Sequence, residues 1–281
     1  SAIRLKLDDD SRISLSNNDA GGTGGRDGTS TNTLFGWNAG ANIASGSVVN
    51  TFIGHASGSG SLDSAQNNVG VGAETLQALT TGDSNTVMGA YSGFALTTGQ
   101  DNVIIGTDAG ASVTTQSDLV LIGRSAGDAI NDDGANGTVA VGEFSLSALT
   151  SGAGNTAVGY QALTTNVDGD RNTAVGYGAL ASHEADTDGH GENTSVGYQA
   201  GGDVSTGTGN TFIGSRAGNQ GTNDITTGDN NTLIGVEAKA SGAGGNNQIV
   251  IGHSATGQAD NSVTLGNADV TDVYMAQDSG A

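Results

Sequence analysis

The chain has 281 residues, among them 49 glycines but no cysteine and no proline. Its 29 acidic side chains outnumber 8 basic ones, and the resulting formal charge of −21 argues against nucleic acid or an anionic membrane as a partner. No apolar run approaches the roughly 20 residues needed to span a bilayer, so insertion into a membrane is not expected.

Residues 1–31 precede a long run of repeats. Ile3 to Leu7 and Arg12 to Leu15 alternate apolar residues with polar or charged ones, which predicts two short strands. We expect this segment to be a cap or junction that closes the open end of the repeat region, because an unpaired end invites aggregation.

Residues 32–266 repeat one short motif fourteen times, and each copy closes on a glycine 14 to 21 residues after the one before. A motif at such a regular period predicts a solenoid, here an all-β parallel β-solenoid of about fourteen short coils. The closing glycines are Gly36, Gly54, Gly72, Gly89, Gly106, Gly123, Gly142, Gly159, Gly176, Gly197, Gly214, Gly235, Gly252 and Gly266.

Three residues before each closing glycine form the predicted strand. The first is always β-branched and the third is always apolar, so we expect these two to point into the core. The residue between them would then face outward. It is large and apolar in many coils, which predicts contact with another copy of the chain. The candidates for a trimer interface are Phe52, Ile104, Leu121, Phe212 and Leu233.

Asparagine opens the motif in ten of the coils. Identical amides stacked one coil apart, about 4.8 Å, can hydrogen-bond along the stack and satisfy turn backbone groups. The alternative is a row of amides that binds a ligand. These residues are Asn32, Asn50, Asn68, Asn85, Asn102, Asn155, Asn172, Asn193, Asn210 and Asn231.

Two coils lengthen to 21 residues, after Gly176 and after Gly214, and insertions in a solenoid often carry binding sites. The first insertion holds Asp186, Asp188 and His190. Calcium on the aspartates or a transition metal on the histidine is one interpretation, and a polar surface loop without a cation is the other. No further cofactor is expected.

Tyr160, Tyr177 and Tyr198 directly follow the closing glycine in three successive coils. The spacing predicts a ladder of tyrosines on one side of the solenoid. Such a ladder either binds the faces of sugars or stabilises the turns by stacking on itself.

Residues 267–281 follow the last repeat. Val270 to Ala276 alternate apolar and polar residues, which predicts a final strand that leaves the solenoid. The abrupt end at Ala281 suggests truncation or cleavage.

The repeats resemble the heads of YadA-type trimeric autotransporter adhesins, through Val-Ile-Ile-Gly at 103–106 and Asn-Thr-Ala-Val-Gly-Tyr-Gln-Ala at 155–162. The resemblance covers residues 32–266 and implies a left-handed parallel β-roll that assembles as a homotrimer. The 17 to 21 residue period that dominates here is longer than the period of those adhesins, and neither a coiled-coil stalk nor a membrane anchor is evident.

Similar repeats occur in bacteriophage tail fibres, and Asn267 to Ala281 resembles the stretch that precedes a self-cleaving intramolecular chaperone in such fibres. This resemblance implies a structural, host receptor-binding segment of a trimeric tail fibre. Its location would be the virion tail, outside the cell. Its partners would be two further copies, an upstream fibre segment, and a glycan or protein of the host cell surface.

Two alternatives remain. One is the head domain of a bacterial trimeric adhesin on the cell surface. The other is a tailspike that degrades polysaccharide, which requires two carboxylates about 5 to 9.5 Å apart in a groove. Asp186, Asp188 and Glu192 share one loop without an aromatic residue beside them, and no catalytic triad spacing or nucleotide fingerprint is evident. We therefore expect no enzymatic activity.

Overall fold

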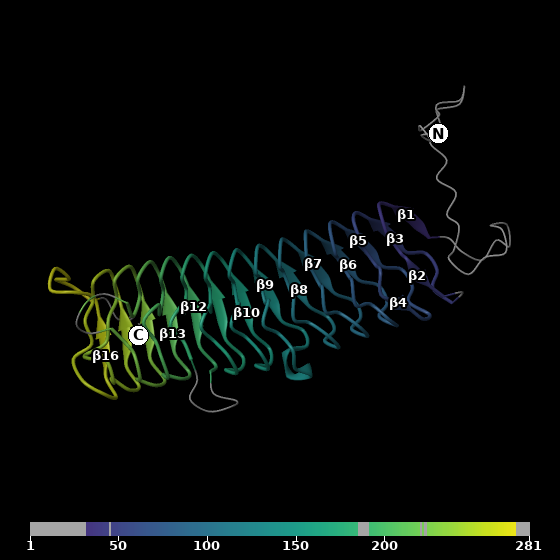
Figure 1. Ribbon diagram of the computed structural model, residues 1–281. Coiled ribbons are helices and arrows are strands. Elements are labelled where there is room, and N and C mark those ends of the chain that lie inside the picture. The colour runs from purple at the N-terminus through teal and green to yellow at the C-terminus, as the bar shows by residue number, and fades with distance from the viewer. Residues whose placement is uncertain (1–31, 45, 185–190, 220, 222–223, 274–281) are drawn as a thin grey trace, which may run out of the picture.

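The computed structural model describes residues 32–44, 46–184, 191–219, 221 and 224–273. These residues form an elongated stack of short coils, with β1 near one end and β16 near the other (Figure 1). The strands predicted within residues 1–31 lie outside the described residues.

Each coil contributes one strand of three residues to a single parallel sheet of fourteen strands. The order in the sheet follows the order in the chain, and equivalent residues pair, as Thr156 does with Thr173. The predicted all-β parallel solenoid is therefore confirmed, with about thirteen turns between the first and last strands. The strands are β1 (Thr33–Phe35), β3 (Thr51–Ile53), β5 (Val69–Val71), β6 (Thr86–Met88), β7 (Val103–Ile105), β8 (Val120–Ile122), β9 (Val139–Val141), β10 (Thr156–Val158), β11 (Thr173–Val175), β12 (Thr194–Val196), β13 (Thr211–Ile213), β14 (Thr232–Ile234), β15 (Ile249–Ile251) and β16 (Val263–Leu265).

Two small elements complete the regular structure of the described residues. β2 (Asn42–Ile43) pairs in parallel with β4 (Ser61–Leu62) on the first two coils. The 3₁₀ helix η1 (Asp133–Ala135) lies in the coil of 19 residues between Gly123 and Gly142.

The predicted asparagine ladder is confirmed. The side-chain nitrogen of Asn85 donates to the side-chain oxygen of Asn68 in the preceding coil at 2.9 Å, and to the carbonyl oxygen of Gly99 in the following coil at 2.9 Å. The backbone N–H of Asn85 donates to the same Asn68 oxygen at 3.0 Å. Because both side chains are fully buried, these bonds offset a desolvation cost of about 1 to 3 kcal/mol per unpaired group.

The closing glycines are required by the turn, as the sequence predicts. Gly159 has φ +142°, a backbone conformation that side chains rarely adopt. A Cβ atom there would lie 2.3 Å from the carbonyl oxygen of Gly176 in the next coil. The stack therefore excludes every side chain at this corner.

The strand side chains face the opposite way from the prediction. Phe52, Ile104, Leu121, Phe212 and Leu233 are fully buried inside the chain itself, so the prediction that they form a trimer interface is wrong. The reason is the two-residue period of a strand. The middle strand residue lies on the same face as the asparagine two residues before it, and the ladder requires that asparagine to be inside.

Interior volume is shared between the middle strand residue and the residue six positions later. In the coils of β1 to β11, and again at β13, a large first residue is matched by glycine, as in Phe52 with Gly58, where a Cβ would lie 2.6 Å from the Phe52 ring. A small first residue in the same coils is matched by leucine, as in Ala157 with Leu163. The coils of β12, β14 and β15 do not follow this pattern. Leu163 keeps the left-handed conformation of the glycines, with φ +52°. Filling the core therefore outweighs a conformational cost of roughly 1 to 2 kcal/mol.

An arginine and a glutamate bridge each of the three coils longer than 18 residues. Arg124 pairs with Glu143 across the 19-residue coil. Across the two 21-residue coils, Arg171 pairs with Glu192 at 3.0 Å and Arg216 with Glu237 at 3.9 Å. These pairs are largely exposed, so each contributes about 1 kcal/mol or less.

The strand predicted at the C-terminal end is not formed by the residues that the structure describes there. Val270 to Val273 have no strand pairing, and Ala276 lies outside the described residues. Val270 instead packs against Gly266, and its backbone N–H donates to the carbonyl oxygen of Asn267 at 3.2 Å.

Because Ala157 and Leu163 share one interior volume, we expect substitutions at these two positions to be energetically coupled. Ala157→Leu alone overpacks the coil, at a cost of about 1 to 3 kcal/mol, and Leu163→Gly alone leaves a cavity, at a cost of about 2 to 5 kcal/mol. The double variant should lose at least about 1 kcal/mol less stability than the sum of the two single losses. Chemical unfolding measures all three free energies.

The matched control combines Ala157→Leu with Leu76→Gly, a leucine of the same type five coils away. The losses of stability caused by these two substitutions should add. If the losses caused by Ala157→Leu and Leu163→Gly also add, the two positions do not share one volume.

Candidate functional site

The outer face of the sheet is an uncharged strip along the whole stack, called the outer strip. Each of the fourteen strands contributes its first and third residue, and none of these 28 positions carries a charge or an amide. All are exposed or half-buried. The first column is Thr33, Thr51, Val69, Thr86, Val103, Val120, Val139, Thr156, Thr173, Thr194, Thr211, Thr232, Ile249 and Val263, and the second is Phe35, Ile53, Val71, Met88, Ile105, Ile122, Val141, Val158, Val175, Val196, Ile213, Ile234, Ile251 and Leu265.

The tyrosine ladder exists, and the structure brings its three members together. The rings of Tyr160 and Tyr177 stack with centroids 5.0 Å apart, and those of Tyr177 and Tyr198 stack at 5.3 Å. The guanidinium of Arg216 lies 5.9 Å from the Tyr198 ring centroid. Because the rings cover one another's faces, the ladder offers a ligand mainly ring edges and hydroxyl groups.

A second aromatic stack follows β1 and β3, at the N-terminal end of the stack of coils. Trp37 and His55 stack with ring centroids 5.0 Å apart, and Trp37 is 69% exposed. The pair repeats the tyrosine arrangement, since both residues directly follow a closing glycine. Self-stacking is thus the general behaviour of aromatic residues at this corner.

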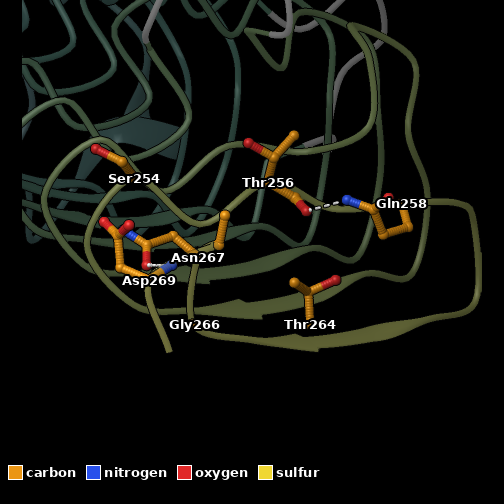
Figure 2. Close-up of a pocket in the computed structure, with 8 residues that line it drawn as sticks. Ser254, Thr256, Gln258, Thr264, Gly266, Asn267 and Asp269 are labelled. Atoms are coloured by element: carbon orange, nitrogen blue, oxygen red, sulfur yellow. Dashed lines mark hydrogen bonds between the residues drawn. The ribbon is translucent and has the colours of Figure 1, made fainter. Parts of the chain in front are cut away.

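A hollow of about 500 Å³ lies at the C-terminal end of the stack, called the end hollow (Figure 2). It forms because the chain after Gly266 leaves the path of the earlier coils. The φ of Gly266 is +81°, whereas the other closing glycines lie between +128° and +143°. The lining residues are Ser254, Thr256, Gln258, Thr264, Gly266, Asn267, Ala268 and Asp269.

Six of the eight residues that line the end hollow have polar side chains. The core column of middle strand residues runs Phe212, Leu233, Val250 and then ends at Thr264, which is only half-buried. The sequence analysis did not identify these residues as a site. One signal in the sequence could have identified them: the middle strand residue, apolar at Val250, carries a hydroxyl at Thr264 in the last copy of the motif.

The interior also contains a polar break next to the long loop, formed by Asn166 and His183. One core column runs Leu149, Asn166, His183 and Val204, with the two polar residues on adjacent coils. Both are fully buried. Among the residues that the structure describes, the side-chain oxygen of Asn166 and both ring nitrogens of His183 have no hydrogen-bond partner.

Burial lowers the pKa of His183 to about 4, and the backbone carbonyl of Ser205 opposes this only in part. The histidine is therefore neutral at pH 7, in a position that most other coils fill with leucine, isoleucine or valine.

The predicted metal ligands Asp186, Asp188 and His190 lie outside the described residues. Glu192, the remaining acidic candidate for sugar cleavage, accepts a hydrogen bond from Nε of Arg171 at 3.1 Å. Within the described ranges, no group of three or more histidine and acidic side chains is placed to hold a metal ion.

A scan against models of known protein families and a search of curated proteins find no match to this chain. In the part of the chain that the structure describes, no helix is long and apolar enough to cross a membrane.

The polar break predicts a loss of stability in acid. The unfolded chain protonates His183 near pH 6.5, whereas the folded chain resists protonation down to about pH 4. Stability is therefore lost as the pH falls through this window, by about 2 kcal/mol between pH 7 and pH 5.

The free energies of unfolding of the wild type and of His183→Leu, measured at pH 7 and pH 5, give the contribution of His183 to this loss. Protonation of the acidic residues is common to both proteins, so the difference between them isolates His183. Equal pH dependence in both would show that the histidine is accessible to solvent in the folded state.

Proposed function

We propose that this chain is a structural and host receptor-binding segment of a trimeric bacteriophage tail fibre, which adheres to a cell-surface glycan or protein without catalysing a reaction. The outer strip is the observation that carries the proposal. It runs the full length of the stack and has the character of an interface between copies.

The dimensions of the outer strip fit an interface. Fourteen strands at about 4.8 Å spacing make a strip about 60 Å long, and two side-chain columns make it roughly 10 to 15 Å wide. The area is on the order of 600 to 900 Å², close to the ~800 Å² per partner of a typical stable complex. Twenty of the 28 positions are apolar and the other eight are threonine, and a largely apolar patch of this size is uncommon on monomeric proteins.

The distribution of charge supports the same conclusion. A trimer carries a formal charge of −63, three times −21, yet none of the acidic residues lies on the outer strip. Association on this face therefore buries no carboxylate, and desolvating a charge would cost several kcal/mol. The acidic turns remain in water, where they keep the assembly soluble.

The tail-fibre assignment itself rests on the resemblance of the repeats and of residues 267–281 to such fibres. A trimer of this kind stiffens the fibre and joins an upstream fibre segment. The head of a bacterial trimeric adhesin would use the outer strip in the same way and is the second candidate.

We expect a trimer in solution, with a mass near 82 kDa, three times 27.4 kDa, by light scattering on a sizing column. Val158→Glu places a charge in the middle of the outer strip and should shift the protein toward monomers. Gln161→Glu adds the same charge at a turn and should leave the mass unchanged. A monomeric wild type would contradict the proposed assembly.

We further expect the assembled segment to bind whole cells. Fluorescently labelled protein, incubated with a panel of bacterial strains, should show saturable binding to at least one strain. Unlabelled protein should compete. If the intact trimer binds none of the strains saturably, the receptor-binding part of the proposal fails and only a structural role remains.

A further inference from the structure

We propose that the end hollow binds one neutral sugar residue of the cell-surface receptor. This inference rests on the proposed function and places receptor recognition at the C-terminal end of the stack. The Tyr160, Tyr177 and Tyr198 ladder is then a structural element.

The lining provides the hydrogen-bonding groups that a sugar needs. Six of the eight lining residues have polar side chains. Two of them are held in place, since the Gln258 side-chain nitrogen donates to the Thr256 carbonyl oxygen at 2.8 Å and the Asn267 side-chain oxygen accepts from the Asp269 N–H at 3.0 Å (Figure 2).

Several groups in the end hollow are left for a ligand. Among the described residues, no hydrogen bond occupies the hydroxyls of Thr256 and Thr264, the side-chain nitrogen of Asn267 or the carboxylate of Asp269. Hydroxyls and a carboxylate accept from sugar hydroxyls, and an amide nitrogen donates to them. Donors and acceptors together match a polyhydroxylated ligand better than a simple ion.

Size and charge narrow the ligand class. A volume of about 500 Å³ lies within the range of about 300 to 1,000 Å³ that is usual for small-molecule sites. Asp269 is the only charged lining residue. No cationic side chain lines the end hollow, so an acidic sugar, a sulfate or a phosphate would be repelled. The geometry therefore points to a neutral sugar.

The end hollow lies on a different face from the proposed interface between copies. Its lining residue Thr264 is the middle residue of β16, on the opposite face of the sheet from the outer strip. Association through the outer strip therefore does not cover the lining residues of the end hollow on the core side of β16.

In the test, the protein is titrated with glucose, galactose, mannose and N-acetylglucosamine, and binding is detected by saturation-transfer NMR. At least one sugar should bind saturably. Thr264→Val removes one hydroxyl and keeps the side-chain shape, and Asn267→Leu removes the amide. Each should weaken binding at least about tenfold, since each leaves a sugar hydroxyl unpaired.

Thr232→Val is the matched control, because it makes the same change on the outer strip and should leave sugar binding unchanged. Binding that persists in both hollow variants, or saturable binding of none of the four sugars, would overturn the proposal. Thr264→Val should retain the wild-type fold, since Val250 occupies the equivalent position one coil earlier.

The same variants separate this proposal from the proposed function. If wild type and Thr264→Val bind cells equally, the end hollow is not the receptor site although the chain remains an adhesive segment. If a sugar binds but no cells do, the site exists and the adhesive role fails.

Discussion

Direct stacking of identical residues is the constraint on which this structure depends. Most asparagines of the ladder accept from the next coil through the side-chain oxygen and donate through the nitrogen, as Asn85 does between Asn68 and Gly99. The side-chain nitrogen of Asn172 is the exception, with no partner among the described residues. A shift of one residue would unpair a buried amide at about 1 to 3 kcal/mol in every affected coil. The register is therefore the same from β1 to β16, and coils lengthen only where the extra residues leave at a corner. His183, in the 21-residue coil that follows Gly176, and Asn166, in the coil before it, are buried polar residues whose ring nitrogens and side-chain oxygen, respectively, have no partner among the described residues.

A fixed register makes each coil a cross-section of nearly constant volume. From β1 to β11, and again at β13, the chain fills that volume in two ways, with a large strand residue opposite glycine or a small strand residue opposite leucine. Leu163 adopts a left-handed conformation that is unfavourable for leucine, because an empty core would cost more. The interior of one chain is thus complete without a partner. The uncharged outer strip therefore requires a separate explanation, and the proposed association with other copies would provide it.

The repeat period was sufficient to predict the solenoid, the asparagine ladder and the closing glycines, because each follows from one residue type at one phase. Which strand face is inside was predicted wrongly. Both faces of β3 are apolar at Phe52 and Ile53, so hydrophobicity could not choose between them, whereas the phase of the buried asparagine does. The tyrosine ladder followed from spacing alone, but that its rings cover each other's faces depends on side-chain torsions. The end hollow depends on the unusual φ of Gly266, which no repeat pattern specifies.

The roles proposed for the outer strip and for the end hollow follow from the same repetition. A face on which every coil contributes the same kind of residue is suited to a long contact with an equally repetitive partner, and another copy of the chain is the simplest such partner. Recognition of a particular receptor needs a site that occurs once. In the described part of the chain, repetition ends at Gly266, where the core column closes with Thr264 and the chain turns across the stack at Asn267 to Val270. Departure from the repeat is therefore the physical reason to expect binding specificity at this end.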